Sequence, residues 1–546
     1  MTVKRPRLKS SLPKRAILSP LPRDKAKDTE SAATPAPSPA RTSGESSGRV
    51  VSPADRTVTS KRRLQRRTTP IEILQQPLQA GMRKVFDLRR FLVVIGLTVL
   101  VLLLPEPPGL STAGHRALAL FVFTASILAL EPAPLPIAAL LVPICQIALG
   151  IDISSGAFAP FGQPVLFLIL GSLFLAEALR KHGLTRRAAL YTIVLSRGNM
   201  SRLLTGLMWV AALLSMWVLN TATAAVLIPV AITIAQRIQP QEKAARALEV
   251  LILGIAIAAS IGGMGTIMGS GENAIASGLL DQYKGFGFVD WMRYGVPLVV
   301  ILVPMSCYLL MRALPIGQVI IDTDPAVKEL GRLGGLKGPE RETVIILIIS
   351  VVLWIAGGSL ESWLGLPDTL LSSAVVAIGA VALLSIEEVI DWNDIKGVNW
   401  GIFFVIGAGL SMGDALNKTG AGIWFAEMLA PLLQGLPFEV ILFALVALGF
   451  CLTQFMNNVT LGAIVAPVLI TLGQATGIDP TRLVIPTITA IALAYMFPSA
   501  SARMTMVAVT GLVDRKSMLR AGLIIGVPSA LVIFVFFYLM SWLGWI

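Results

Sequence analysis

Two stretches of the sequence decide the fold: LNTATAAVLIPV, which spans Leu219–Val230, and NNVTLGAIVAPV, which spans Asn457–Val468. Each places Asn and Thr inside a long apolar run and carries a proline further along. The asparagines Asn220 and Asn458 align at an offset of 238 residues, and the two prolines align at the same offset. The chain therefore contains an internal repeat.

Two further pairs of segments support the repeat. EALRKHG at Glu177–Gly183 and DALNKTG at Asp414–Gly420 each follow a glycine-containing apolar run, and they lie 237 residues apart. A weaker pair, Gly262–Ala274 and Ala494–Met506, places small and polar residues at the end of an apolar run. Inverted repeats are a common way to build secondary transporters.

The composition indicates an integral membrane protein. Of the 546 residues, 55% are hydrophobic and 14% are charged, whereas a soluble domain carries about 25% charged residues. Several apolar runs approach the roughly 20 residues that cross a bilayer as a helix, and the strand alternation of a membrane barrel is absent. We expect an all-α polytopic membrane protein with about eleven transmembrane helices and two re-entrant hairpins in two inverted repeats.

The positive charge is concentrated at the N-terminus. Residues 1–90 hold 21 Lys and Arg against 7 Asp and Glu, in a context rich in Ser, Pro and Thr. Such a segment buries too little apolar surface to offset its ordering entropy, so we expect a disordered basic tail. The positive-inside rule then predicts a cytoplasmic N-terminus. Attraction to anionic lipid head groups is the alternative role for this charge.

The remaining chain is expected to divide into two halves. Asn and Thr compete for backbone hydrogen bonds and favour helix breaks, so broken helices are expected near residues 220 and 458. The short runs Pro164–Leu179 and Trp400–Leu416 each contain a glycine near the middle and are expected to fold back as hairpins. The expected organisation is a first half at 91–311 with a hairpin near 160–183, a connecting loop at 312–342, and a second half at 343–546 with a hairpin near 398–420.

The charged segments suggest local ion pairs. Glu177 and Lys181 are four residues apart, as are Asp414 and Lys418. Residues at this spacing lie on one face of a helix and can pair. We expect these charges to stabilise helix ends rather than to bind a ligand.

Enzymatic motifs are absent from the sequence. The cysteines Cys145, Cys307 and Cys451 lie in different apolar segments, and the two histidines lie at segment ends, so no metal-binding spacing is present. No HExxH, Walker loop or GxSxG motif occurs. ATP-driven transport and hydrolytic catalysis are therefore not expected, and no cofactor or nucleic-acid partner is indicated.

These features resemble the divalent anion:sodium symporter family, the dicarboxylate and citrate carriers of the wider ion transporter superfamily. That family carries two Ser-Asn-Thr signatures preceded by re-entrant hairpins. Here Leu219-Asn220-Thr221 and Asn457-Asn458-Val459 stand at the signature positions. The resemblance covers about residues 90–546.

The resemblance implies a homodimer embedded in lipid, in which each protomer has a scaffold part and a transport part that moves as an elevator. Substrate carboxylates would lie between the two signatures, and sodium ions would lie at the two broken-helix loops. The residues expected to contact substrate are Asn220, Thr221, Ser270, Asn457, Asn458, Ser501 and Arg503. Those expected at sodium sites are Asn220, Gly269, Thr453, Asn458 and Ala500.

Several positions depart from the family pattern. Leu219 replaces the first signature serine, and Val459 replaces the second threonine. Glu272 and Arg503 stand where the family places prolines in the two loops. Charges at membrane depth are costly unless they are paired or functional. We therefore expect these two to pair with each other or with the ligand, and Arg503 to hold the anion directly or by standing in for a cation, with weakened sodium coupling. The alternative is that Arg503 reaches the interface and Glu272 caps a helix.

The favoured function is secondary active transport of a small organic dianion, a C4-dicarboxylate such as succinate or malate, in a bacterial inner membrane. Transport of sulfate, another oxyanion or an arsenite-like solute is an alternative, because sulfate fits helix N-termini well. A non-transporting membrane receptor is a further alternative, and a membrane enzyme is disfavoured by the missing catalytic motifs.

Overall fold

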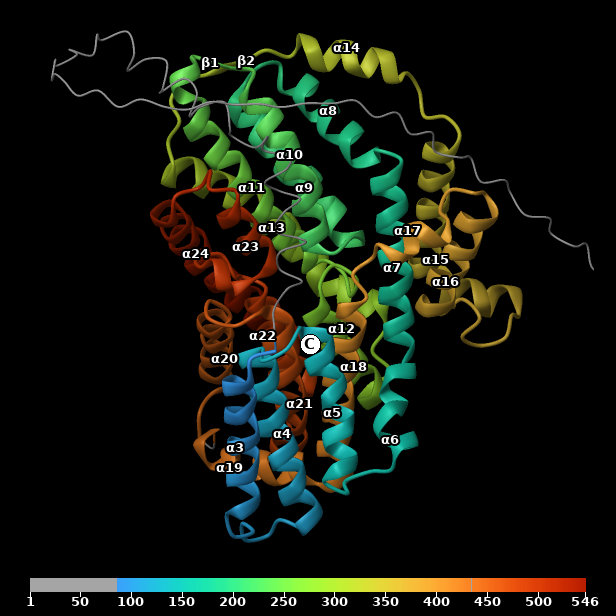
Figure 1. The fold of residues 1–546 in the computed structure, drawn as a ribbon, viewed down its shortest axis with the longest axis vertical. Coiled ribbons are helices and arrows are strands. Elements are labelled where there is room, and N and C mark those ends of the chain that lie inside the picture. The colour runs from blue at the N-terminus through green and yellow to red at the C-terminus, as the bar shows by residue number, and fades with distance from the viewer. Residues whose placement is uncertain (1–85, 434) are drawn as a thin grey trace, which may run out of the picture. The chain divides into compact units, whose positions relative to one another are not determined.

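The computed structural model describes residues 86–433 and 435–546. The basic tail expected at residues 1–90 lies, except for its last five residues, outside this part of the chain. Nearly all of the described residues that form regular structure are helical, and one two-stranded sheet joins β1 (Ile238–Gln239) to β2 (Ile320–Ile321). The expected all-α class is confirmed (Figure 1).

The helices of the first half follow one another through short connections. Three-residue or four-residue 3-10 segments, η2 (Ala159–Gly162) and η3 (Gln241–Lys243), lie between some of them. The α-helices are α3 (Leu88–Leu103), α4 (Thr112–Leu130), α5 (Leu135–Ala148), α6 (Ser154–Phe158), α7 (Pro164–Lys181), α8 (Leu184–Ser196), α9 (Met200–Trp217), α10 (Asn220–Ala235), α11 (Ala244–Gly263), α12 (Gly271–Lys284) and α13 (Phe288–Ala313).

The segment expected as a connecting loop at 312–342 contains β2 and α14 (Asp324–Leu333). The second half then continues to the C-terminus, with the 3-10 segment η4 (Pro498–Ala500) before its last two helices. Its α-helices are α15 (Pro339–Leu364), α16 (Ser373–Ile386), α17 (Trp392–Lys396), α18 (Gly401–Thr419), α19 (Ala421–Leu433), α20 (Phe438–Thr453), α21 (Asn458–Thr476), α22 (Pro480–Ile491), α23 (Ala502–Val509) and α24 (Arg515–Trp542).

The apolar helices account for a polytopic membrane protein. In the described part, seven helices are long and apolar enough to cross a membrane, or eight if the bent pair Ser154–Gly162 and Pro164–Lys181 forms one span. Four shorter apolar helices, α5, α10, α16 and α20, accompany them. The expected number of about eleven spans is reached when these shorter helices are included.

The order of elements repeats between the halves. The run α7 to α13 is matched by the run α18 to α24, with the breaks at Asn220 and Asn458 in equivalent places. Packing crosses between the repeats: α12 packs on α21, and α23 packs on α10. The two repeats therefore share one interior rather than forming separate bodies.

The interruption at Asn220 is the tip of a helical hairpin. The chain turns at Val218, which is extended, and Leu219, between α9 and α10. The bases of the two legs meet the same strand, because the N–H of Ile321 donates to Gly198 O at 3.2 Å and the N–H of Asp322 donates to Arg237 O at 3.1 Å. Since α9 starts and α10 ends at this strand, the chain returns to the side from which it entered.

The interruption before Asn458 has the same form. The segment between α20 and α21 turns at residues 454–457. The guanidinium of Arg482, in the first turn of α22, lies 4.1 Å from the ring centre of Phe438, the first residue of α20. Because α22 follows the end of α21 directly, both legs of this hairpin also share one base. In Figure 1 the helices of the first hairpin are labelled above, and α20 and α21 below.

The positions expected for the hairpins were wrong. Pro164–Leu179 lies within the continuous helix α7, and Trp400–Leu416 lies almost entirely within the continuous helix α18. A bend of 45° separates α7 from the segment before it, which is too small to reverse the chain. The chain reverses instead at the two asparagine breaks, which were expected as broken spans.

The charged segments form ion pairs that differ from the expected ones at one helix. Lys418 pairs with Asp414 at 2.7 Å, as expected, and also with Asp152 at 2.8 Å. The hydrogen bond from Lys418 holds the pKa of Asp152 below its usual value. Glu177 pairs with Arg180 rather than with Lys181, which reaches Asp394 at 2.6 Å.

The close approach of α9 to α11 provides a stability test. A Cβ on Gly262 would lie 2.1 Å from Ala212 O and 2.5 Å from Ala212 Cα, both backbone atoms that cannot rotate away. We expect Gly262→Val to destabilise the fold by at least about 1–3 kcal/mol through overpacking. The measurement is the melting temperature of the detergent-purified protein.

The control is Gly358→Ala, because a Cβ at Gly358 meets no atom within 4 Å. That variant should match or slightly exceed the parent in stability, since Ala is the better helix former. A Gly262→Val protein that melts with the parent would show that the α9–α11 contact is looser than described.

Candidate functional site

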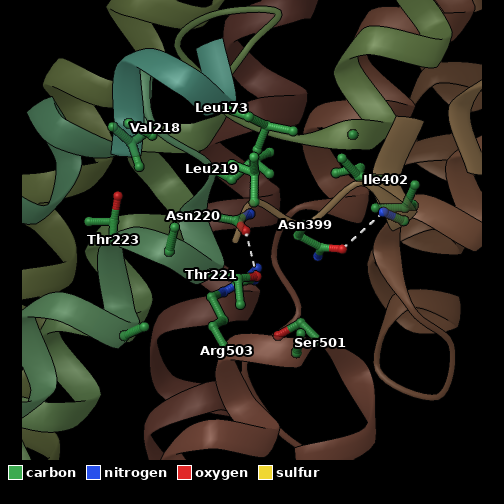
Figure 2. Close-up of a pocket in the computed structure, with 18 of the residues that line it drawn as sticks. Leu173, Val218, Leu219, Asn220, Thr221, Thr223, Asn399, Ile402, Ser501 and Arg503 are labelled. Atoms are coloured by element: carbon green, nitrogen blue, oxygen red, sulfur yellow. Dashed lines mark hydrogen bonds between the residues drawn. The ribbon is translucent and has the colours of Figure 1, made fainter. Parts of the chain in front are cut away.

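A cavity of about 560 Å³ lies where the two hairpin tips meet. Its size falls within the roughly 300–1,000 Å³ of small-molecule sites. Figure 2 shows Asn220 and Thr221 from the first tip near Ser501 and Arg503 from the second repeat. Asn457 and Asn458 from the second tip also line it. The six residues expected to contact substrate that line this cavity are Asn220, Thr221, Asn457, Asn458, Ser501 and Arg503.

Four helices begin at the cavity wall. The first residues of α10, α12, α21 and α23 are Asn220, Gly271, Asn458 and Ala502, and all four line the cavity. The first-turn amides of a helix lack partners inside the helix, and the helix dipole adds about half a positive charge there. Helix N-termini favour anions, so four such ends suit the cavity to a negatively charged ligand.

The first hairpin tip is held against the loop between α11 and α12. The N–H of Asn220 donates to Gly269 O at 3.2 Å, and the hydroxyl of Thr221 donates to Asn220 Oδ1 at 3.2 Å. Asn220 is almost fully buried. Asn220 thus lines the cavity while its backbone ties the hairpin tip to Gly269.

The second hairpin tip is held by a network that crosses the repeats. Asn458 Nδ2 donates to Glu272 Oε1 at 3.2 Å, and the hydroxyl of Thr453 donates to Asn458 Oδ1 at 3.2 Å. Asn457 Oδ1 accepts from the N–H of Val459 and caps α21. The Asn458 amide thus joins its own hairpin to the first turn of α12, which belongs to the other repeat.

Arg503 is the most buried cation at the site. Its side chain is 1% exposed, and Nη2 donates to Ala492 O at 3.1 Å and Ala494 O at 3.4 Å. Its Nε has no hydrogen-bond partner among the described residues. Glu272 is equally buried, and both residues line the cavity, but they form no ion pair with each other. Of the two expected arrangements, the direct salt bridge is not formed, and pairing of these charges with the ligand stays a prediction.

Three hydroxyl groups near the site lack hydrogen-bond partners in the described structure. Thr223 and Thr460 line the cavity with buried, unpartnered Oγ1 atoms. The Oγ of Ser270 is likewise buried and unpartnered, but Ser270 does not line the cavity. A buried polar group without a partner is costly, so these hydroxyls are available for a ligand.

Of the five residues expected at sodium sites, Asn220 and Asn458 line the cavity and the other three lie behind its wall. Asn220 is hydrogen-bonded to Gly269 in the first repeat, and Thr453 is hydrogen-bonded to Asn458 in the second. Gly269, Thr453 and Ala500 are fully buried or nearly so and do not line the cavity. Whether any of these residues binds sodium stays a prediction.

Sequence reasoning missed several residues of the wall. Asn399 lies on the segment between α17 and α18, and its Oδ1 accepts from the N–H of Gly401. Glu177 and Arg180, which pair with each other, line the cavity from α7. Thr223 and Thr460 follow the two asparagines along the same helices, so helical spacing could have indicated them.

Comparison with known proteins agrees with this fold. The family profile described as the sodium:sulfate symporter transmembrane region matches residues 86–546. The chain is 31% identical over 456 residues to an uncharacterised transporter of Haemophilus influenzae, covering 82% of this chain and 95% of that protein. It is 28% identical over 470 residues to the sodium-dependent dicarboxylate transporter SdcS of Staphylococcus saprophyticus, covering 81% and 89%.

A solved structure shares the fold at low identity. The structure of MtrF from Neisseria gonorrhoeae superposes with a TM-score of 0.53 at 12% identity, covering 82% of this chain and 94% of that one. The family match and the relatives identify a membrane transporter of anions, not an enzyme. The chain belongs to the sodium:sulfate symporter family, the same divalent anion:sodium symporter family that its motifs resemble.

Proposed function

We propose that this protein is a secondary active transporter of C4-dicarboxylates such as succinate or malate. The observation that carries the proposal is the convergence of four helix N-termini on one cavity, with a buried arginine in its wall. Because α10 packs on α23 and α12 packs on α21, the four ends fall into two pairs. Two pairs of helix ends suit a ligand with two separated carboxylates.

The relative named as a sodium-dependent dicarboxylate transporter supports the same substrate class and supports sodium as the coupling ion. A compact dianion such as sulfate places both charges at one centre, so it uses the two pairs of helix ends less well. We therefore favour dicarboxylate over sulfate.

The packing supports an elevator as the proposed transport cycle. The two hairpins and the broken helices α11–α12 and α22–α23 contact one another across the repeats, so they are suited to move together as the transport part of an elevator. The proposed assembly is a homodimer in the bacterial inner membrane with a cytoplasmic N-terminus. Lipid and the second protomer would cover the exposed apolar faces of α15 and α24.

The test is counterflow of labelled succinate into proteoliposomes loaded with unlabelled succinate, malate or sulfate. We expect internal succinate and malate to drive uptake, and sulfate to drive little. Uptake driven by sulfate in preference to succinate would contradict the assignment. Specific binding of succinate without any flux would indicate a receptor.

A further inference from the structure

Each repeat has a further helix break after its hairpin. The two breaks have the same layout, but different side chains bond to their backbone carbonyls. The first break, residues 264–270, separates α11 from α12, and the second, residues 492–501, separates α22 from α23. Each leaves backbone carbonyls at the end of one helix beside the next helix start. Carbonyls at such breaks are suited to hold a cation, and this is one way in which transporters bind coupling ions.

At the first break the donor to these carbonyls is neutral. Asn273 Nδ2 donates to Gly263 O at 2.8 Å and to Thr266 O at 2.9 Å. The other amide atom, Asn273 Oδ1, is buried and has no partner among the described residues, and neither does Ser270 Oγ. This break therefore contains buried oxygen atoms with unused lone pairs and no cationic side chain.

At the second break the donor is a cation. Arg503 Nη2 donates to Ala492 O and Ala494 O. The carbonyls between and beside them are occupied as well: Thr453 donates to Ile491 O at 2.6 Å, and Gln454 Nε2 donates to Leu493 O at 2.9 Å. Four consecutive carbonyls thus accept from side chains, and the positive charge is already present.

We propose that Arg503 acts as a tethered cation at the second break, so that the transport cycle uses one sodium ion, bound at the first break through Asn273 Oδ1 and Ser270 Oγ. The guanidinium is always protonated, so the second break carries its charge in every state of the cycle. This inference rests on the proposed function of coupled anion transport. It assigns the coupling ion to one repeat of the two.

The two ways in which Arg503 could act are separable by substitution. Arg503→Gln keeps an amide donor, as Asn273 supplies in the first repeat, but removes the charge. Arg503→Lys keeps the charge but loses the planar, forked donor. If the charge is what matters, Lys substitutes for Arg; if the hydrogen bonds to the carbonyls are what matter, Gln does.

The experiment measures succinate uptake into proteoliposomes as sodium replaces choline at constant ionic strength. The parent and Arg503→Lys should show sodium activation with a Hill coefficient of about one. In Arg503→Gln the second break should require its own ion. The sodium concentration for half-activation should then rise by about tenfold or more, and the Hill coefficient should exceed that of the parent. Asn273→Ala should abolish sodium activation without removing Arg503.

Three results would overturn the inference. One is a parent curve with a Hill coefficient of about two. Another is an Arg503→Gln protein with the parent's sodium curve, whether or not Arg503→Lys is impaired. The third is unchanged sodium activation in Asn273→Ala.

A second measurement separates this inference from the proposed function. If the parent moves no succinate, the proposed function fails, and the melting temperature of the purified protein in sodium against choline chloride still tests the cation sites. Sodium should raise the melting temperature of Arg503→Gln more than that of the parent, because a second ion then binds the folded state. Equal shifts in the two proteins would overturn the tethered cation.

Discussion

Replacing Asn458 with alanine is expected to reduce anion uptake by about 100-fold or more. The Asn458 side chain donates to Glu272 and accepts from the Thr453 hydroxyl, which it shares with Ile491 O, so the substitution removes both hydrogen bonds of this amide. Losing two hydrogen bonds of roughly 1.5 kcal/mol each accounts for a loss of this size. The measurement is initial uptake of labelled succinate, and Asn220→Ala should behave alike because it holds the equivalent position at the first tip.

Folding must be intact for this result to concern the site. Asn417→Ala is the matched control, because Asn417 is exposed near the end of α18 and does not line the cavity. All three variants should elute as the parent does in gel filtration, and Asn417→Ala should transport normally. Normal uptake in either tip variant would remove the proposed binding site.

Glu272→Ala is expected to weaken transport by about tenfold or more. The change removes the acceptor of the Asn458 amide and also leaves the buried Arg503 charge without the nearby carboxylate. A hydrogen bond to a charged group contributes roughly 1.5–3 kcal/mol, which corresponds to at least about a tenfold change in an equilibrium constant. The measurement is the succinate concentration that gives half-maximal uptake.

The companion variant Glu272→Gln distinguishes the hydrogen bond from the charge. Gln retains an acceptor oxygen for Asn458, so it should preserve the hairpin tip. It also removes a negative charge from an anion site, which should lower the half-saturating succinate concentration relative to the parent. If Glu272→Gln is as impaired as Glu272→Ala, the carboxylate charge itself is required and the hydrogen-bond argument is wrong.

The breaks in the two key helices were predictable from local chemistry. Asn and Thr next to a proline-containing apolar run are poor continuations of a helix, and Asn220 and Asn458 do start new helices. Duplication strengthened this prediction, because one interruption has many explanations while two at a fixed offset have few. The direction of the chain after each break was not predictable, since it depends on strand and ring contacts made far along the sequence.

The misplaced hairpins show how glycine can mislead. Gly171 was taken as a point where α7 could fold back. A Cβ there would instead lie 2.7 Å from Ala377 Cβ and 2.9 Å from its backbone. This glycine allows α7 and α16 to approach closely. A sequence alone does not distinguish a glycine needed for a turn from one needed for a contact, because the partner helix lies about 200 residues away.

The candidate site was also predictable only in part. Its residues within one segment, such as Asn220 with Thr221, followed from the motif. The connection between repeats, from Asn458 to Glu272, required the folded structure. Such contacts depend on how two distant segments fit together, and no local pattern encodes them.

The small sheet at the base of the first hairpin has a mechanical consequence. The segment at strand β2 bonds through its backbone to residues just before α9 and just after α10. It therefore ties the two legs of the hairpin together. The legs cannot spread at this end without breaking backbone pairs. At the base of the second hairpin the guanidinium of Arg482 lies over the ring of Phe438, and no strand pair of the described residues joins the two legs there. We therefore expect the base of the first hairpin to be the stiffer of the two.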